Sequence, residues 1–319
     1  MLYNVYRPTS FRDVLGQPAA VVLKNLVHRG RMPHSLLLTG TRGVGKTTLA
    51  RICARALNCE SDEKPCERCK SCRTKRHPDI FEIDTAAYGS SDSISNLIHS
   101  MQLAPDYSRR VYIFDEAHTL SSKSMSMLLK SVEEPRSSSI VFLLTTDPDK
   151  IDIALRSRCM WLKLGSLDKR NILRLLARVS ITEEIRISRQ ALVAIADRSK
   201  GSARDALSIL EMFSDREHEV TEKDVYELAG ERVDTSDLVN RMFVGNTKAA
   251  LDEIDRLYTF HASKAIVDSC LSELASRMRS NVENGTSPLL PMRWMKAVSK
   301  SRLDFANSYI PQRALEVAL

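Results

Sequence analysis

The sequence is poor in the residues and runs that mark fibrous, disordered or membrane-spanning chains. Glycine and proline each number 11 among 319 residues, and aromatic residues make up 6%. With 43% apolar and 27% charged residues, the composition excludes a collagen-like, low-complexity or disordered chain. The longest apolar run, Ile140 to Leu144, is far shorter than the roughly 18 residues that a membrane span needs. No basic segment followed by an apolar one opens the chain, so we expect no secretory signal and a soluble, cytoplasmic protein.

Positive charge is concentrated in the first part of the chain. Residues 1–200 hold 32 Lys and Arg against 21 Asp and Glu, a balance of +11. The other 119 residues hold 15 against 19, a balance of −4. A basic field of this kind suits a polyanion such as nucleic acid, and a solubilising surface bias is the alternative.

Strand and helix patterns alternate in the first half of the sequence. Short apolar runs predict strands at 35–40, 80–84, 111–114 and 140–144. Amphipathic segments predict helices at 47–57, 94–103 and 122–133. This alternation predicts an α/β fold with a parallel, doubly wound sheet.

Beyond about residue 167 the pattern becomes helical. Helices are predicted at 169–179, 189–199 and 202–213, and Thr221 with Asp224 resembles a capping box at the start of another. Turn residues at 245–246 and 284–288 interrupt the last helical segment. We therefore expect an α/β domain at 1–166, a small helical lid at 167–232 and a second helical domain at 233–319.

A glycine-rich segment follows the first predicted strand and opens a helix. Residues 40–47, Gly-Thr-Arg-Gly-Val-Gly-Lys-Thr, fit G-x-x-x-x-G-K-[ST] at every fixed position. Its glycines let backbone N–H groups curl around phosphate oxygens, Lys46 brings a charge to the terminal phosphates, and Thr47 brings a hydroxyl to Mg²⁺. The segment therefore predicts nucleotide binding.

Two carboxylates directly follow the predicted strand at 111–114. Asp115 is placed to hold Mg²⁺ through water, and Glu116 is placed to orient or deprotonate an attacking water. A plain acidic turn is the alternative. The letters Asp-Glu-Ala-His at 115–118 also suggest a helicase, but nothing else in the sequence indicates the second motor domain that such helicases need.

Four of the seven cysteines, Cys59, Cys66, Cys69 and Cys72, fall within fourteen residues. A disulfide framework fits a small secreted domain better than a mid-sized chain without a signal. Four thiolates at this spacing suit a structural, tetrahedral zinc ion, with an iron–sulfur cluster or metal-free thiols as alternatives. We expect the scattered cysteines to be small buried hydrophobes: Cys53, Cys159 and Cys270.

The order and spacing of several strings resemble the gamma/tau family of bacterial DNA polymerase III, the ATPase of the sliding-clamp loader in the AAA+ superfamily. The resemblance is dense from about residue 3 to residue 215 and thin afterwards. Its strings are Tyr6-Arg7-Pro8 with Phe11 and Gly16-Gln17, 40–48 (GTRGVGKTT), 57–59 with the cysteine triplet, 115–121 (DEAHTLS), 128–130, 133–135, 145–148, 157–159 and 201–208 (GSARDALS).

The resemblance implies an AAA+ P-loop NTPase fold with a zinc-binding insertion, a helical lid and a C-terminal helical collar. It implies that Lys46 and Glu116 act in hydrolysis and that Thr47 and Asp115 hold Mg²⁺. Thr146 and Arg204 correspond to the sensors, and Arg158 to an arginine finger that reaches the nucleotide of a neighbouring subunit. The implied ATP-binding residues, including the segment against the adenine, are Tyr6, Arg7, Pro8, Gly40, Thr41, Gly43, Val44, Gly45, Lys46, Thr47 and Thr48.

Members of this family assemble as five subunits, joined by collar domains, in an open spiral around primer–template DNA. The resemblance thus implies other clamp-loader subunits, a sliding clamp and primed DNA as partners, and no membrane. The segment 85–92 is less basic than a DNA-facing loop should be, so Lys123, Lys130 and Lys150 are the candidates for phosphate contacts. The segment after residue 233 is short for a collar, which suggests a truncated chain, a short gamma-like form or a compact phage relative acting in its host's cytoplasm.

We expect an ATP-driven motor that opens a ring clamp and loads it onto primed DNA. One alternative is a structural clamp-loader subunit that hydrolyses nothing, but such a subunit needs no intact Lys46, Thr47, Asp115 and Glu116. The other is a different AAA+ DNA motor, such as a branch-migration helicase, and the four-cysteine insertion counts against it.

Overall fold

The computed structural model describes residues 1–74, 76–87, 96–98, 100–101, 103–134, 138–229, 234–260 and 263–305. The chain forms two compact units, Met1–Leu228 and Ala229–Leu319. Among the described residues, no helix combines the length and the hydropathy of a membrane span.

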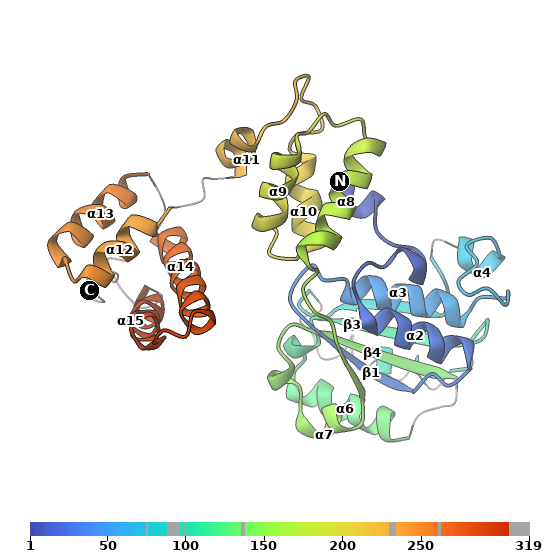
Figure 1. Ribbon diagram of the computed structural model, residues 1–319. Helices are drawn as coiled ribbons and strands as arrows, with labels where there is room; N and C mark the ends of the chain where they lie inside the picture. The colour runs from blue at the N-terminus through green and yellow to red at the C-terminus, as the bar shows by residue number, and fades with distance from the viewer. Residues whose placement is uncertain are drawn as a thin grey trace. The chain divides into compact units, whose positions relative to one another are not determined.

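Five parallel strands form the sheet of the first unit (Figure 1). In spatial order they are β2 (Ile80–Asp84), β3 (Arg110–Asp115), β4 (Ser139–Thr145), β1 (Ser35–Thr39) and β5 (Met160–Lys163). β4 lies between β1 and β3, with Thr145 beside Thr39. Because the strands are parallel, their carboxyl ends meet at one edge of the sheet, where open α/β sheets bind ligands.

Apolar side chains cover both faces of this sheet. Leu36 and Leu38 of β1 pack against α2 (Pro18–His28) and α3 (Lys46–Leu57). Leu37 points to the other face, which α6 (Ser122–Glu133) and α7 (Ile153–Ser157) cover (Figure 1). Strands that are buried on both faces form continuous apolar runs, and every residue of β4 is buried.

The α/β fold with a parallel sheet is confirmed, and all four predicted strands are present. The strand β5 has no clear signal in the sequence, because this edge strand has only four residues and alternates between half-buried and exposed positions. The predicted helix at 122–133 matches α6, and α3 begins one residue before its predicted start. The predicted helix at 94–103 and the segment 85–92 lie partly outside the described residues.

A second core in this unit is helical. It buries Leu2, Leu176, Leu207 and Phe213. The contributing helices are α1 (Leu2–Val5), α8 (Lys169–Thr182), α9 (Arg189–Arg198), α10 (Ala203–Glu211) and α11 (Glu222–Ala229).

The predicted capping box at the start of α11 is present. The Thr221 amide donates to Asp224 Oδ2 over 2.8 Å, and the Asp224 amide donates to Thr221 Oγ1 over 3.4 Å. Side-chain oxygens of Asp168, Ser188 and Ser202 each accept one backbone amide and so cap α8, α9 and α10. The boundary between an α/β domain and a lid near residue 166 stays a prediction.

The second unit is a helical bundle with its own core. Leu238, Ile254, Cys270 and Leu274 are fully buried in it. Left-handed glycines lie at the predicted turns, Gly245 with a φ of 74° and Gly285 with a φ of 69°. The helices are α12 (Ser236–Val244), α13 (Thr247–Phe260), α14 (Ser263–Glu283) and α15 (Leu289–Phe305).

Candidate nucleotide site and cysteine cluster

A cavity of about 660 Å³ lies at the carboxyl edge of the sheet in the first unit. Its walls come from the N-terminal segment, the glycine-rich loop, the end of β3 and helices α8 and α10. Twelve of the predicted site residues line it: Tyr6, Arg7, Pro8, Gly43, Val44, Gly45, Lys46, Thr47, Thr48, Asp115, Glu116 and Arg204. The structure also describes Gly40, Thr41, Thr146 and Arg158, and these do not line the cavity.

The glycine-rich loop takes a backbone path that other residues do not readily follow. Gly43 and Gly45 have φ values of 79° and 104°, in the left-handed region that favours glycine. A Cβ on Gly40 would lie 2.4 Å from the Leu164 carbonyl oxygen. The glycines therefore let the loop pack tightly against its neighbours and leave its amides free to curl around an anion.

Lys46 lies at the base of this loop and is only 6% exposed. Its Nζ donates to the carbonyl oxygens of Gly40 and Thr41 over 2.8 and 3.0 Å. Burial lowers the pKa of Lys46, and the nearby carboxylates of Glu116 and Asp115 oppose that shift. The loop thus holds a single ammonium group close to two acidic side chains.

The loop threonine and the strand aspartate are in direct contact. Thr47 Oγ1 donates to Asp115 Oδ2 over 2.7 Å, and Asp115 Oδ1 accepts the amide of Glu116 over 3.0 Å. A hydroxyl and a carboxylate at this separation can share one Mg²⁺ ion, directly or through its water molecules. The predicted Mg²⁺ pair is therefore assembled from β3 and α3.

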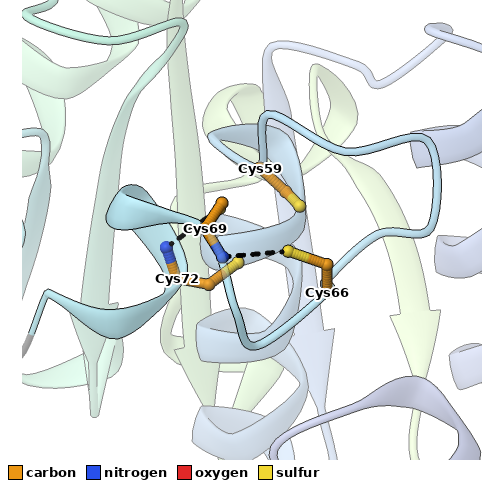
Figure 2. A group of neighbouring side chains, drawn as sticks. All are labelled: Cys59, Cys66, Cys69 and Cys72. Atoms are coloured by element: carbon orange, nitrogen blue, oxygen red, sulfur yellow. Dashed lines mark hydrogen bonds between the residues drawn. The ribbon is translucent and has the colours of Figure 1, made fainter.

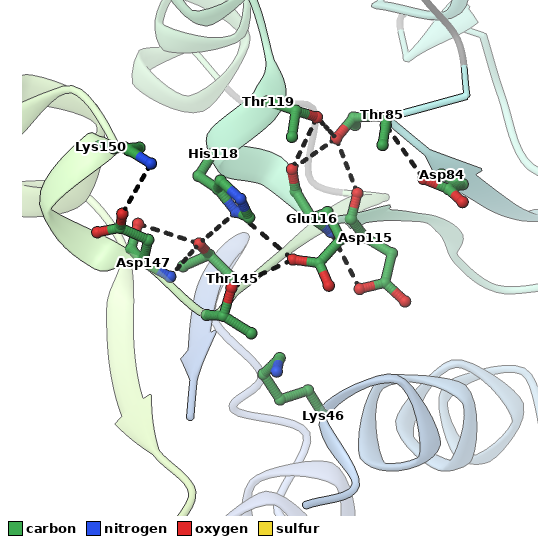
Figure 3. A network of polar contacts seen from close by, with 12 residues as sticks. Lys46, Asp84, Thr85, Asp115, Glu116, His118, Thr119, Thr145, Asp147 and Lys150 are labelled. Carbon is green, nitrogen blue, oxygen red and sulfur yellow. Dashed lines mark hydrogen bonds and ion pairs between the residues drawn. The ribbon is translucent and has the colours of Figure 1, made fainter. Parts of the chain in front are cut away.

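Glu116 adopts a left-handed backbone conformation, with a φ of 51°. The Thr85 hydroxyl, at the end of β2, lies 2.8 and 2.7 Å from the carbonyl oxygens of Asp115 and Glu116. The Glu116 carboxylate oxygen Oε2 lies 3.5 Å from Thr146 Oγ1. It also lies 3.5 Å from His118 Nδ1 (Figure 3). Thr146 does not line the cavity itself, but it contacts Glu116, which does.

The N-terminal segment joins the helical part of the unit to the cavity. The Tyr6 hydroxyl donates to Glu183, and this hydrogen bond raises the pKa of Tyr6. The Arg204 guanidinium lies over the Tyr3 ring, 4.8 Å from its centroid. Burial and then the charge of Arg51 lower the pKa of Arg7. Positive charge thus lines the cavity from both the N-terminal segment and α10.

Arg158 lies near the amino ends of strands β1 and β5, whereas the cavity lies at the carboxyl ends of the strands. The arginine lies two residues before the start of the parallel strand β5, and Ser35 Oγ at the start of β1 donates to its carbonyl oxygen over 2.8 Å. Its guanidinium pairs with Glu133 Oε1 at 2.8 Å and donates to the Ala154 carbonyl over 2.9 Å. The structure therefore separates Arg158 from the cavity of its own chain.

The three lysines predicted to contact nucleic acid are exposed and also lie outside the cavity. Lys123 and Lys130 are on α6, and Lys150 pairs with Asp147 Oδ2 at 3.1 Å. Lys150 also lines a second, separate hollow of about 380 Å³, together with Ser122 and Ser126 of α6.

The four clustered cysteines converge in space beside the short helix α4 (Lys70–Arg73) (Figure 2). All four Sγ atoms lie within 4.8 Å of one another. The amide of Cys69 donates to Cys66 Sγ over 3.3 Å and is the largest cause that lowers the pKa of Cys66, to about 6. The amide of Cys72 donates to Cys69 Sγ over 3.4 Å.

This arrangement fits one tetrahedral ion. Zinc–sulfur bonds of about 2.3 Å place the sulfurs of a tetrahedral site roughly 3.8 Å apart. A multi-iron cluster spreads its thiolates over several metal atoms and needs wider spacing. Of the scattered cysteines, Cys53 and Cys270 are fully buried, as expected, whereas Cys159 is only half-buried.

Sequence reasoning missed several residues that shape the site. Gln17 has no functional signal beyond its place in a string, but its Nε2 donates to the carbonyl oxygens of Val44 in the loop and Gly165 beyond β5, over 3.2 and 2.7 Å. Thr85 follows a predicted strand, which was a usable signal. His118 and Thr145 had no signal beyond their place in a string, because their contacts form only when β3 and β4 pair.

Similarity to known proteins covers the part of the chain that contains the nucleotide site. Residues 16–168 match the family model described as DNA polymerase III, delta subunit. The chain is 38% identical over 218 residues to DNA polymerase III subunit gamma of Buchnera aphidicola subsp. Acyrthosiphon pisum, and 39% identical over 216 residues to subunit tau of Escherichia coli K12. Both alignments cover 66% of this chain, with 60% of the Buchnera protein and 34% of the Escherichia protein. The matched region therefore spans less than two thirds of these relatives.

Solved structures of Thermotoga maritima RuvB share the fold. One of them, a point mutant, has a TM-score of 0.54 at 19% identity and covers 79% of this chain and 86% of its own. A second point mutant has a TM-score of 0.51 at 21% identity, with coverage of 77% and 74%. Across 66% of its length, the chain is therefore similar in sequence to the bacterial DNA polymerase III gamma and tau subunits, and it shares its fold with RuvB.

Proposed function

We propose that this chain is an ATPase subunit of a DNA polymerase III-type clamp loader, which opens a sliding clamp and places it on primed DNA in the cytoplasm. The contact between Thr47 and Asp115 at 2.7 Å carries the proposal. It joins the glycine-rich loop to the acidic end of β3 inside a cavity that also contains Lys46, Glu116 and Arg204.

In the proposed reaction, Lys46 and the loop amides bind the phosphates of ATP. Thr47 and Asp115 hold Mg²⁺, which neutralises charge on the phosphates when it is bound. Glu116 orients a water molecule and takes its proton as the water oxygen bonds to the γ-phosphorus. The bond from that phosphorus to the bridging oxygen breaks, and ADP leaves with this oxygen. Thr146 lies 3.5 Å from Glu116 and helps to place its carboxylate.

Two arginines complete the proposed site from different chains. Arg204 lines the cavity of its own chain and binds the phosphates from α10. Arg158 lies at the other edge of the sheet, so we assign it to the nucleotide of a neighbouring subunit. Such a finger is worth roughly 10³–10⁵ in rate in other NTPases, and it makes hydrolysis depend on assembly.

The proposed assembly has further clamp-loader subunits, a sliding clamp and primer–template DNA as partners. Lys123, Lys130 and Lys150 are exposed, and we assign them to contacts with DNA phosphates. The helical unit after Leu228 has its own core, which suits a collar that joins subunits.

A steady-state ATPase assay tests the proposal. Turnover of the purified chain should be weak, and should rise strongly when primed DNA, the cognate clamp and the partner subunits are all added. Lys46→Ala should abolish ATP binding, whereas Lys223→Ala, at an exposed lysine of α11, should not. Unchanged nucleotide affinity in Lys46→Ala would refute the site, and turnover indifferent to clamp and primer would refute the clamp-loading role.

We also assign a structural zinc ion to Cys59, Cys66, Cys69 and Cys72. Replacing Cys72 with serine removes one of four thiolates, so the purified variant should lose the bound zinc and part of its thermal stability. Cys159→Ser lies outside the cluster and is the matched control. Elemental analysis of both variants measures the bound metal. An equal zinc content in the two variants would exclude the site. Iron instead of zinc would show that the assigned metal is wrong.

A further inference from the structure

Two side chains lie close to the Glu116 carboxylate: His118, in the short helix Ala117–Thr119, and Thr146, which follows β4. Glu116 Oε2 lies 3.5 Å from both His118 Nδ1 and Thr146 Oγ1, and neither is a short hydrogen bond. His118 is only partly exposed, with 19% of its side chain accessible, whereas Thr146 is exposed. His118 is therefore the more firmly placed of the two neighbours of this carboxylate.

Hydrogen bonding around Thr145 fixes which atom of His118 carries a proton. The Thr145 hydroxyl, fully buried, donates to the Asp147 carbonyl over 3.1 Å and accepts the Asp147 amide over 2.9 Å. With that proton directed to the carbonyl, we assign the ring as the donor at the 3.1 Å contact with His118 Nδ1. A protonated Nδ1 also suits the neighbouring carboxylate, which only accepts hydrogen bonds.

The same contacts continue to the surface (Figure 3). The Asp147 carboxylate pairs with Lys150 Nζ at 3.1 Å, and this hydrogen bond is the largest cause that lowers the pKa of Asp147. Lys150 and His118 both line the 380 Å³ hollow, which shares no residue with the nucleotide cavity. His118 therefore contacts Glu116 on one side and a second, outer surface on the other.

We infer that His118 is a positioning residue for Glu116, held by Thr145 and Asp147, and that Lys150 is the outer end of this network. The inference rests on the proposed function and extends it to residues that act through Glu116. His118 donates its Nδ1–H to Thr145, which holds the same nitrogen 3.5 Å from Glu116 Oε2, and the N–H dipole there fixes the direction of the carboxylate relative to the attacking water. The network ties that direction to the ion pair at the second hollow.

Variants at His118 separate positioning from structure. His118→Phe keeps a ring of similar size but has no N–H, so kcat should fall about tenfold to a hundredfold, as expected when a reacting group is misplaced. His118→Asn restores a donor near the position of Nδ1 and should recover most of that loss. KM and the affinity for a fluorescent ATP analogue should stay at wild-type values in both variants, because neither touches the nucleotide.

Thr145→Val provides a second route if His118→Phe folds poorly. It has nearly the same shape as the wild type and removes only the hydroxyl that fixes the ring. Thr145→Val should lower kcat. The double variant with His118→Phe and Thr145→Val should lose no more kcat than the worse single variant, because the effects of coupled residues are not additive. Additive losses in kcat would overturn the network.

Lys150→Met tests the outer end in the absence of DNA. A network residue should lower DNA-free kcat by about two- to fivefold, in line with the modest worth of an exposed ion pair. A lysine that only binds DNA would leave DNA-free turnover unchanged, and that result would overturn its place in the network. Lys223→Met, which breaks the exposed pair with Glu227, is the control.

Lys46→Ala, measured in the same assay, separates failure of the proposed function from failure of the positioning role of His118. If Lys46→Ala still binds and hydrolyses ATP, the proposed function fails. If Lys46→Ala is inactive while His118→Phe and Thr145→Val retain wild-type kcat, the proposed function stands and the positioning role of His118 is wrong.

Discussion

At the scale of single residues, the site depends on contacts between segments that are far apart in the chain. Thr47 and Asp115 are separated by 68 positions, yet their side-chain oxygens lie 2.7 Å apart. The sequence predicted both residues from their local strings, since a glycine-rich loop and a strand that ends in acids each carry a local pattern. It could not predict Gln17 or His118, whose partners are carbonyl and hydroxyl oxygens that sheet packing alone brings near.

Asp115→Asn should separate metal binding from site geometry. The amide oxygen still accepts the Thr47 hydroxyl, but the negative charge that Mg²⁺ needs is lost. We expect ATP hydrolysis at saturating nucleotide to fall by about 100-fold, while nucleotide binding measured in EDTA stays unchanged. Thermal unfolding of the variant is the control for its fold, and wild-type turnover at limiting Mg²⁺ would contradict the assignment.

Arg158→Ala should affect assembled sites only. Its guanidinium pairs with Glu133 at the edge of the sheet away from the cavity, so nucleotide affinity of the isolated chain should not change. Turnover stimulated by DNA, clamp and partner subunits should be lost. Arg174→Ala, at an exposed arginine of α8, is the matched control. A wild-type chain that hydrolyses equally fast alone and in the assembly would argue against a finger in trans.

At the scale of elements, helix caps were predictable and the last strand was not. The box of Thr221 and Asp224 is a local pattern, and the structure forms it as predicted. β5 has four residues at a sheet edge, and its strand character comes from pairing with β1 rather than from its own pattern.

Asp224 makes the stability of α11 sensitive to acid. The Thr221 hydroxyl and then its amide lower the pKa of Asp224 to about 2, below the value of about 3.9 for an unfolded chain. The contribution of this carboxylate is thus complete above about pH 4 and is lost as pH falls towards 2. Asp224→Asn should lower Tm by a constant amount between pH 7 and 5, with a gap that closes at more acidic pH. Asp252→Asn, at an exposed position of α13, is the control, and a gap that widens in acid would contradict this account.

At the scale of the whole molecule, every residue that lines the cavity belongs to the first compact unit. A chain that ends at Leu228 should therefore bind nucleotide as tightly as the full chain, because neither the loop nor its partners are removed. It should lose association with other subunits if the second unit is a collar. Equilibrium nucleotide titration and sedimentation of both chains check these two outcomes, and weaker nucleotide binding by the shorter chain would contradict the first.

The position of Arg158 determines how many complete nucleotide sites an assembly of these chains can have. β1 separates the glycine-rich loop from Arg158 by its own length of roughly 13 Å, with the loop at one end and the arginine at the other. If Arg158 is the finger that we propose, each chain offers an arginine on one side and receives one on the other, so contacts of this kind are head-to-tail. A closed ring completes as many nucleotide sites as it has subunits. An open row would leave one site without this arginine, and we expect the chain at that end to bind ATP but not to hydrolyse it.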